Sequence, residues 1–298
     1  MMAAAAWRSL PDGRRLHLTH GPIDIILEAG GTPQAVAAAH AAAVGRFGTI
    51  LTELCAELAL LRAPANRLPR LPTGAVARRM CAAVRPYCHE VFITPMAAVA
   101  GSVADEVLAE TLAVAGTQAG LRHLYVNNGG DIALHLAPGE GFTLGVVDDP
   151  QAPRLAGTVR IAAASGVRGV ATSGWRGRSF SLGIADAVTV LATSASAADA
   201  AATIIANAVD LPGHPAIARV PAASRQPDSD LGERLVTIGV GTLDRMAIDA
   251  ALDRGLDTAR ILLADGHIVA AVLLLGGHAR TAGNLDLALP APAVRIAA

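Results

Sequence analysis

The amino-acid sequence predicts an α+β fold in which antiparallel-rich sheets pack against helices. Of the 298 residues, 52% are hydrophobic, which is enough to bury a large core. Helical patterns dominate the chain up to residue 115, and from 122 to 191 short apolar strands follow one another with turn residues between them. Consecutive strands of this kind favour antiparallel pairing over repeated β–α–β units. Because the chain shows no internal repeat, we expect one domain over 1–298 with short, loosely held termini.

The first elements are predicted from apolar alternation and from helix-start signals. Alternation over 16–27 indicates two short strands that turn at the Gly-Pro step 21–22. Thr32 and Pro33 then start a helix, because threonine is a good N-cap and proline at the first turn sacrifices no hydrogen bond. We expect this helix to reach about residue 62, where a proline-rich connector begins.

The later elements follow from the same patterns. We expect further helices over 75–85, 95–115, 196–207 and from about 241 to 264. Strands are predicted over 90–93, 123–127, 132–136, 142–147, 158–163, 187–191, 235–240 and 268–275. The segment 211–230 holds four prolines and is predicted to be a long loop.

Composition excludes several chemistries. All 24 basic residues are arginine, so this chain has no lysine for a Schiff base or a lysine-bearing phosphate loop. A net charge of −1, with only two Trp, two Tyr and four Phe, argues against a nucleic-acid partner. Three cysteines without paired spacing indicate neither a disulfide framework nor a zinc site. No apolar run approaches the length of a membrane span, so we expect a cytoplasmic protein with no membrane partner.

Two short motifs have the composition of ligand-binding loops. In the first, Asn128, Gly129, Gly130 and Asp131 lie between two predicted strands, where paired glycines allow close approach to a ligand and the aspartate adds a carboxylate. A plain hairpin turn is the alternative, and the motif alone favours it. In the second, the hydroxyls of the Thr172–Ser173 step suit phosphate oxygens, with an ordinary turn as the alternative.

Two aspartates on predicted helices also stand out. Asp105 lies on a small-residue apolar stripe, so it needs a partner, either a helix cap, an arginine or a ligand; Glu106 is expected on a solvent-facing side. Asp199 and Thr203 are four residues apart on one helix face, and both offer the hard oxygen that Mg²⁺ prefers. A capping box that starts at Ser196 is the alternative, which this pair alone favours.

An acidic pair, Asp228 and Asp230, lies in the proline-rich loop. It has the ligands to reach a metal, but an ordinary turn is the more common role of such a sequence.

The order of these motifs resembles the ApbE superfamily of flavin transferases. The matching pieces are the Ala-Gly-x-x-x-Asp helix, VNNGGDI, GVVDDP, GVATSG and AVTVLATSASAADAAAT. The runs TPMAAVAGSVADEV, SFSLGIADAVTV and QPDSDLG are most similar to an uncharacterised bacterial and archaeal branch of that superfamily. The resemblance extends over about 16–283.

The resemblance implies an α+β fold, a bound FAD or FMN and a Mg²⁺ ion. It places the cofactor against eight residues: Gly101, Asp105, Asn128, Gly129, Gly130, Asp131, Thr172 and Ser173. It assigns Mg²⁺ to Asp199, Thr203 and the carbonyl of Ala97. The reaction it implies moves FMN from FAD onto a threonine of an acceptor protein, with release of AMP.

Two departures from the transferases put that reaction in question. Ala100 stands where the family has a lysine, and no histidine occurs between His135 and His214, where the family has one. Asp131 or Ser181 is the candidate substitute for a base, and no catalytic residue is assigned. We therefore expect a protein that binds a flavin or adenine nucleotide with Mg²⁺; FMN transfer is one hypothesis, and a binding or scaffold protein without transferase chemistry is the other. The sequence leaves a homo-oligomer open and identifies no acceptor protein.

Overall fold

The computed structural model describes residues 4–115, 120–147, 155–284 and 287–288. Its centre is a nine-stranded sheet in which all neighbouring strands are antiparallel. In spatial order the strands are β1 (Ala6–Ser9), β2 (Arg15–His20), β3 (Ile23–Gly31), β4 (Leu121–Asn128), β5 (Asp131–Leu136), β8 (Gly169–Ser173), β9 (Ala187–Ala192), β12 (Ala270–Leu275) and β13 (His278–Gly283). The α+β class predicted from the sequence is confirmed.

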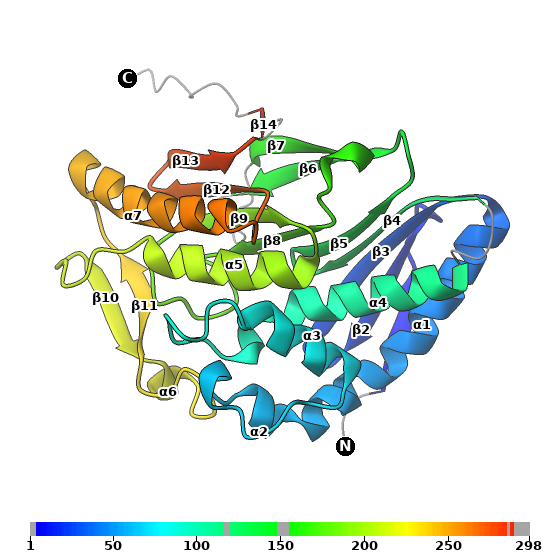
Figure 1. Ribbon diagram of the computed structural model, residues 1–298, viewed down its shortest axis with the longest axis horizontal. Coiled ribbons are helices and arrows are strands. Elements are labelled where there is room, and N and C mark those ends of the chain that lie inside the picture. The colour runs from blue at the N-terminus through cyan, green and yellow to red at the C-terminus, as the bar shows by residue number, and fades with distance from the viewer. Residues whose placement is uncertain (1–3, 116–119, 148–154, 285–286, 289–298) are drawn as a thin grey trace.

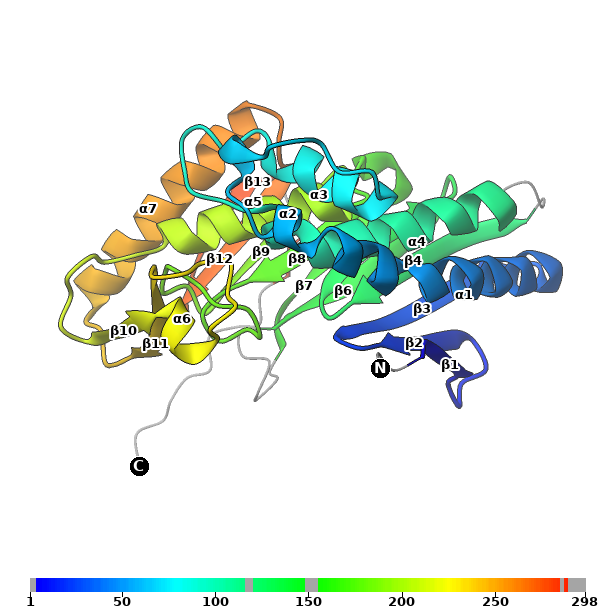
Figure 2. The same cartoon turned by 90° about the horizontal axis from the view of Figure 1, so that it is seen from below.

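Helices cover one face of this sheet (Figures 1 and 2). The fold contains the helices α1 (Pro33–Ala56), α2 (Leu58–Leu61), α3 (Ala75–Val84), α4 (Val99–Ala115), α5 (Ala195–Ala208), α6 (Ala222–Arg225) and α7 (Arg245–Ala264), with short 3₁₀ turns η1 (Ala65–Arg67), η2 (Pro95–Ala98) and η3 (Ala163–Ser165). Of these, α6 packs against β10 rather than the large sheet, and η3 follows β7. The predicted start of α1 is confirmed, since the Thr32 side chain accepts a hydrogen bond from the Ala35 N–H and Pro33 occupies the first turn.

Two smaller sheets complete the fold. β10 (Ile217–Pro221) pairs with β11 (Leu235–Val240), and β14 (Leu287–Ala288), β7 (Leu155–Ala162) and β6 (Gly141–Val147) form the other sheet. Val159 and Ile161 of β7 pack against Leu134 and Leu191 of the large sheet. The central strands therefore have helices on one face and the β6–β7 sheet on the other.

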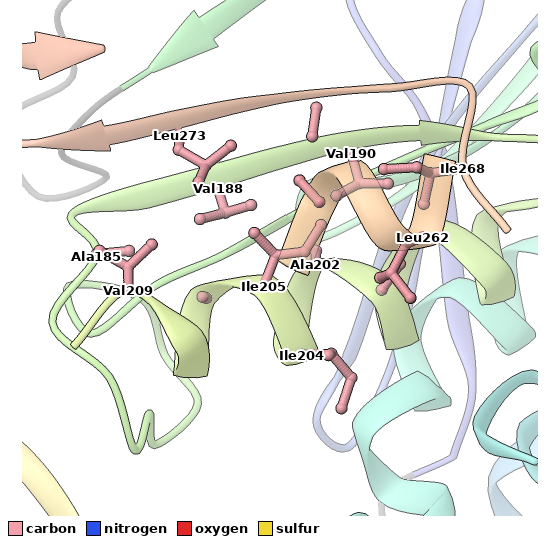
Figure 3. Close-up of a cluster of buried hydrophobic side chains, with 14 of the residues drawn as sticks. Ala185, Val188, Val190, Ala202, Ile204, Ile205, Val209, Leu262, Ile268 and Leu273 are labelled. Atoms are coloured by element: carbon pink, nitrogen blue, oxygen red, sulfur yellow. The ribbon is translucent and has the colours of Figure 1, made fainter. Parts of the chain in front are cut away.

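The main core lies between the sheet and the helices α5 and α7. Figure 3 shows Val188 of β9 and Leu273 of β12 facing Ile205 of α5, with Leu262 of α7 beside them. All four are buried. The alternate residues of these strands, such as Leu191, point to the opposite face and pack against the β6–β7 sheet. Both faces of these strands are therefore apolar.

Several predicted elements are corrected by the structure. Residues 90–93 form no strand; they follow a turn in which the Glu90 N–H donates to the Tyr87 carbonyl. The helix expected to reach residue 62 is interrupted at Glu57 and resumes as α2 to Leu61. The Glu57 carboxylate reaches the start of α3, where it accepts hydrogen bonds from Thr73 N and Gly74 N, both at 2.9 Å. The predicted loop 211–230 contains β10 and α6.

The solvent-facing position predicted for Glu106 is also corrected. Its side chain is buried, with the residue 3% exposed, and it receives hydrogen bonds from Arg46 Nε at 3.0 Å and Arg79 Nε at 2.9 Å. Two guanidinium groups offset the cost of burying this carboxylate.

By length and composition alone, α1 is apolar enough to cross a membrane, with a mean hydropathy of 1.2 over its best 18-residue window. One face of α1, including Phe47, Ile50 and Leu54, is buried in the protein.

Candidate functional site

The candidate site begins where α4 and α5 start. The two helices run in opposite directions from the centre of the molecule (Figure 1) and overlap along their first two turns. They approach closely at Gly101, where an added Cβ would lie 2.3 Å from the Ala195 carbonyl oxygen. Only glycine fits at this contact, which explains the residue that the sequence places in the Ala-Gly-x-x-x-Asp motif.

Each helix provides a carboxylate to the start of the other. Asp199 Oδ2 of α5 accepts a hydrogen bond from the Gly101 N–H of α4 at 2.9 Å. Asp105 of α4 accepts from the N–H groups of Ala195 at 2.9 Å and Ser196 at 2.8 Å. The first N–H groups of a helix lack partners within the helix, and the two positive helix ends would repel each other without negative charge between them. Both aspartates therefore stabilise the contact between the two helices.

These contacts give each of the two aspartates a helix start as a partner. For Asp105, both oxygens are engaged by α5, so its partner is a helix start. The capping box proposed for α5 is not formed, because Ser194 is the N-cap and accepts from the Ala197 N–H at 3.2 Å. Asp199 caps a helix, but that helix is α4 rather than its own.

The Asn-Gly-Gly-Asp motif is a hairpin turn that also belongs to the site. Asn128 pairs with Asp131 across the turn, and Gly129 and Gly130 adopt φ values of +68° and +111° that favour glycine. The Asn128 side-chain amide donates to the Ala100 carbonyl at 3.1 Å, which ties the turn to the start of α4. The hairpin interpretation is thus confirmed, and the hairpin is part of the site.

The turn is joined to β8 in the same way. The Thr172 N–H donates to Asp131 Oδ1 at 3.3 Å, and the Thr172 and Thr189 hydroxyls lie 2.9 Å apart. Ser173 ends β8 one residue later. The structure thus brings the predicted residues of α4, the β4–β5 turn, β8 and α5 to one place.

The predicted metal ligands lie on neighbouring elements. Thr203 follows Asp199 by four residues along α5, and Ala97 lies in η2, which packs against α5. In the part of the chain that the structure describes, no group of three or more His, Cys, Asp or Glu side chains is placed to hold a metal. A Mg²⁺ ion at this site would therefore need oxygen ligands from a bound ligand or from water, as this ion commonly does.

The carboxylates of the site are held in an environment that favours their protonated forms. Burial raises the pKa of Asp131 to about 7, against the opposing effects of the Thr172 N–H and the Arg178 charge. Burial also raises the pKa of Asp199 well above its ordinary value, and the negative charge of Asp131 adds to this shift. Burial raises the pKa of Asp105 in spite of its hydrogen bonds to α5. Three neighbouring acids with raised pKa values form a site that a cation would stabilise.

A cavity of about 260 Å³ opens on the other face of the sheet. It lies between β5, β8 and β9 on one side and β6 and β7 on the other, and is lined by Asn127, Gly130, Ile132, Thr143, Leu144, Gly145, Val159, Val170, Thr172, Thr189 and Leu191. Gly130 and Thr172 belong both to this lining and to the predicted site. Pockets for whole ligands usually measure roughly 300–1,000 Å³, so this cavity suits one ring system of a larger ligand.

Other candidate residues are used elsewhere. Ser181 is 3% exposed, and its hydroxyl donates to Asn207 Oδ1 at 3.3 Å near the end of α5, so it serves packing rather than the site. Asp228 pairs with Arg62 at 2.7 Å, and Asp230 accepts a hydrogen bond from the Thr94 hydroxyl, so the proline-rich segment docks on the chain before α4. Residues 148–150 of the GVVDDP motif lie outside the described residues.

The structure also adds a residue that the sequence analysis missed. Arg178 lies in the loop after β8, and its Nη2 would be 2.1 Å from a Cβ placed on Gly129. Only the fold brings this guanidinium to the β4–β5 turn. In the sequence, its position five residues after Ser173 is the one available signal.

The chain is similar to several curated archaeal proteins. They include a UPF0280 protein of Methanopyrus kandleri, 39% identical over 134 residues, covering 44% of this chain and 48% of the relative. A UPF0280 protein of Methanothermobacter thermautotrophicus is 41% identical over 122 residues, covering 40% and 44%. The chain thus spans about half the length of the curated relatives it matches.

Among solved structures, the flavinyl transferase ApbE of Pseudomonas stutzeri in its apo form matches with 14% identity and a TM-score of 0.38, over 94% of both chains. The ApbE protein of Thermotoga maritima matches with 17% identity and a TM-score of 0.38, over 64% of this chain and 51% of that one. The profile of the family described as AbpE bacteria matches residues 7–281. This match covers nearly the whole chain and agrees with the resemblance found in the sequence, and the chain belongs to that family.

Proposed function

We propose that this protein binds a flavin or adenine nucleotide, such as FAD or FMN, together with Mg²⁺. The observation that carries this proposal is the convergence of the predicted residues. Gly101, Asn128, Asp131, Thr172 and Asp199 come from four separate parts of the chain. Direct hydrogen bonds join Gly101 to Asp199 and Thr172 to Asp131, and Asn128 bonds to Ala100 next to Gly101, with a cavity beside them. The family membership supplies the ligand class, because flavin nucleotides are what the ApbE resemblance implies.

In this proposal the ring and the phosphates of the nucleotide contact different parts of the site. Its ring occupies the cavity, whose walls include five aliphatic side chains and carry the hydroxyls of Thr172 and Thr189 for polar ring atoms. Its phosphates lie against Gly129 and Gly130, where the absence of side chains allows close approach.

The donor set fits Mg²⁺. Asp199 would provide a carboxylate, Thr203 a hydroxyl and Ala97 a carbonyl, all hard oxygen ligands. The bound ion would neutralise charge on phosphate oxygens. The chain itself positions Asp199 through the Gly101 N–H, and the repulsion between Asp199 and Asp131 is relieved once a cation is present.

Between a binding protein and a transferase, the residues favour binding. Ala100 replaces the family lysine, and the Ser181 hydroxyl is sealed in the packing at the end of α5. Loss of a positioned base typically lowers a rate by about 10²–10⁴-fold. We therefore propose that FMN transfer to a threonine-bearing acceptor is slow or absent; strong in-gel flavin fluorescence of an acceptor domain after incubation with FAD and Mg²⁺ would contradict this.

The test of binding is thermal unfolding with FAD, FMN or ADP, each with and without Mg²⁺. At a free ligand concentration of about 100 times Kd, the stability gain is about 2.7 kcal/mol, which raises Tm measurably. We expect the rise to need both nucleotide and Mg²⁺. If none of the three nucleotides raises Tm in the presence of Mg²⁺, the proposed function is wrong.

A further inference from the structure

Arg178 is an exposed arginine placed against the glycine turn of the site. Its guanidinium reaches Gly129, where any Cβ would collide with Nη2, and its positive charge acts on Asp131. Within the described residues, no carboxylate oxygen forms an ion pair with Arg178, unlike the neighbouring Arg176, whose Nε lies 2.7 Å from Asp186 Oδ1. Among the residues that the structure describes, the Arg178 charge therefore faces the glycine turn and Asp131.

The loop that carries Arg178 is fixed at its base. Asp186 accepts hydrogen bonds from Trp175 Nε1 at 3.2 Å and, through its other oxygen, from the Gly276 N–H at 2.7 Å. The Trp175 N–H also donates to the Ala185 carbonyl at 3.0 Å. Arg178 thus extends from an anchored segment, which limits the entropy lost when it binds a ligand.

The charge balance of the site shows what Arg178 is suited to bind. Asp105, Asp131 and Asp199 are neighbouring acids, and in their ionised forms they would repel a phosphate-bearing ligand unless positive charge compensates for them. A guanidinium matches two phosphate oxygens through paired N–H groups. Arg178 touches Gly129, and the next residue, Gly130, forms part of the cavity wall.

We propose that Arg178 binds a phosphate group of the nucleotide whose ring occupies the cavity beside Gly130. This inference rests on the proposed function and deepens it, because it makes the phosphate, rather than the ring alone, the group that the site selects. A purely structural Arg178, which only offsets the charge of Asp131, is the competing explanation.

The test compares two probes that share a ring and differ in one phosphate, riboflavin and FMN. Both are titrated by flavin fluorescence at fixed Mg²⁺ against the full-length protein. We expect the wild-type protein to bind FMN more tightly than riboflavin. Arg178→Gln should weaken FMN binding by about 10–100-fold, the value of a charge-assisted contact, and leave riboflavin affinity unchanged. Arg178→Lys should weaken FMN binding less than Arg178→Gln does, because lysine keeps a positive charge although it lacks the paired N–H donors.

A matched control removes an equally exposed arginine away from the site. Arg225→Gln on α6 should change neither affinity. If wild-type protein prefers FMN and Arg178→Gln keeps that preference, the role of Arg178 is overturned while the proposed function stands. The role is overturned in the same way if the variant loses FMN and riboflavin affinity equally. If wild-type protein binds neither probe, nor FAD or ADP, the proposed function fails and this inference fails with it.

Discussion

Asp105 and Asp199 lie on two antiparallel helices, and each carboxylate binds the N-terminus of the helix that carries the other. This arrangement holds two positive helix ends in contact and places Asp199 beside Asp131 and the glycine turn. Both aspartates bind a helix start, but we expect them to differ in function. Asp105 is held by the N–H groups of Ala195 and Ser196, whereas Asp199 is held by the main chain of Gly101 and Ala100 and also lies beside Asp131.

Asp105→Ala tests the structural role. It leaves the buried N–H groups of Ala195 and Ser196 without their acceptor, and each unpaired group costs about 1–3 kcal/mol. We expect a clear loss in the free energy of unfolding measured with urea. The control Asp257→Ala removes a carboxylate that is 71% exposed and should change stability by no more than about 0.5 kcal/mol. Equal stability of the two variants would refute the capping role.

Asp199→Asn separates helix capping from metal binding. The asparagine oxygen still accepts from the Gly101 N–H, but the negative charge that Mg²⁺ needs is gone. Stability without ligand should stay the same or rise, because an ionisable carboxyl group with a raised pKa is removed from a buried position. The Mg²⁺-dependent rise in Tm with nucleotide should disappear, and Thr203→Val should weaken it at nearly constant volume. The metal assignment is defeated if both variants keep the full response.

The raised pKa of Asp131 predicts a pH dependence of stability. Burial places this pKa at about 7 in the folded protein, above its ordinary value of 3.8. Between these two values the folded state binds more protons than the unfolded state, so the Asp131 contribution to stability falls as pH rises and levels off above about pH 7. The slope approaches about 1.4 kcal/mol per pH unit at most. In urea unfolding between pH 4 and 7, the free energy of unfolding of Asp131→Asn should change less with pH than that of the wild type. Superimposable pH profiles of the two proteins would contradict the raised pKa of Asp131.

Gly101→Ala tests the close approach of the two helices. Its Cβ would meet the Ala195 carbonyl at 2.3 Å, so the helices must separate, at a cost of about 1–3 kcal/mol. Gly48→Ala on α1 is the matched control, since no atom beyond its chain neighbours and its own helix backbone lies within 4 Å of its Cβ. In that exposed helix position alanine should stabilise the protein by about 0.5–1 kcal/mol. Opposite signs in the two unfolding experiments are expected; destabilisation of both to the same extent would argue against a specific contact at Gly101.

Local patterns are sufficient for the elements with strong periodicity. The strand pair at the N-terminus, the Asn-Gly-Gly-Asp hairpin and the α5 helix follow directly from alternation, turn chemistry and small apolar residues. β13 is missed because its sequence HARTAG carries no apolar alternation; it is held by pairing with the buried strand β12. β10 is missed because prolines surround it.

Long-range contacts account for what the sequence could not decide in the site. The partner of Asp105 is 90 residues away, and that of Asp199 is 98 residues away, so neither cap has a local signal. The burial of Glu106 likewise depends on Arg46, 60 residues earlier. The sequence order of the motifs selected the residues of the candidate site, but only the fold shows which of them touch.

The contact between the N-termini of α4 and α5 also affects how the chain folds during synthesis. The Gly101 N–H meets its acceptor only when residue 199 is available, 98 residues later. At roughly 5–20 residues per second, the ribosome needs about 5–20 s to add that segment. During this interval the start of α4 has no cap from α5, and the β4–β5 turn has no second helix beside it. The candidate site thus belongs to the late stage of folding, and a chain truncated before α5 would lack it altogether.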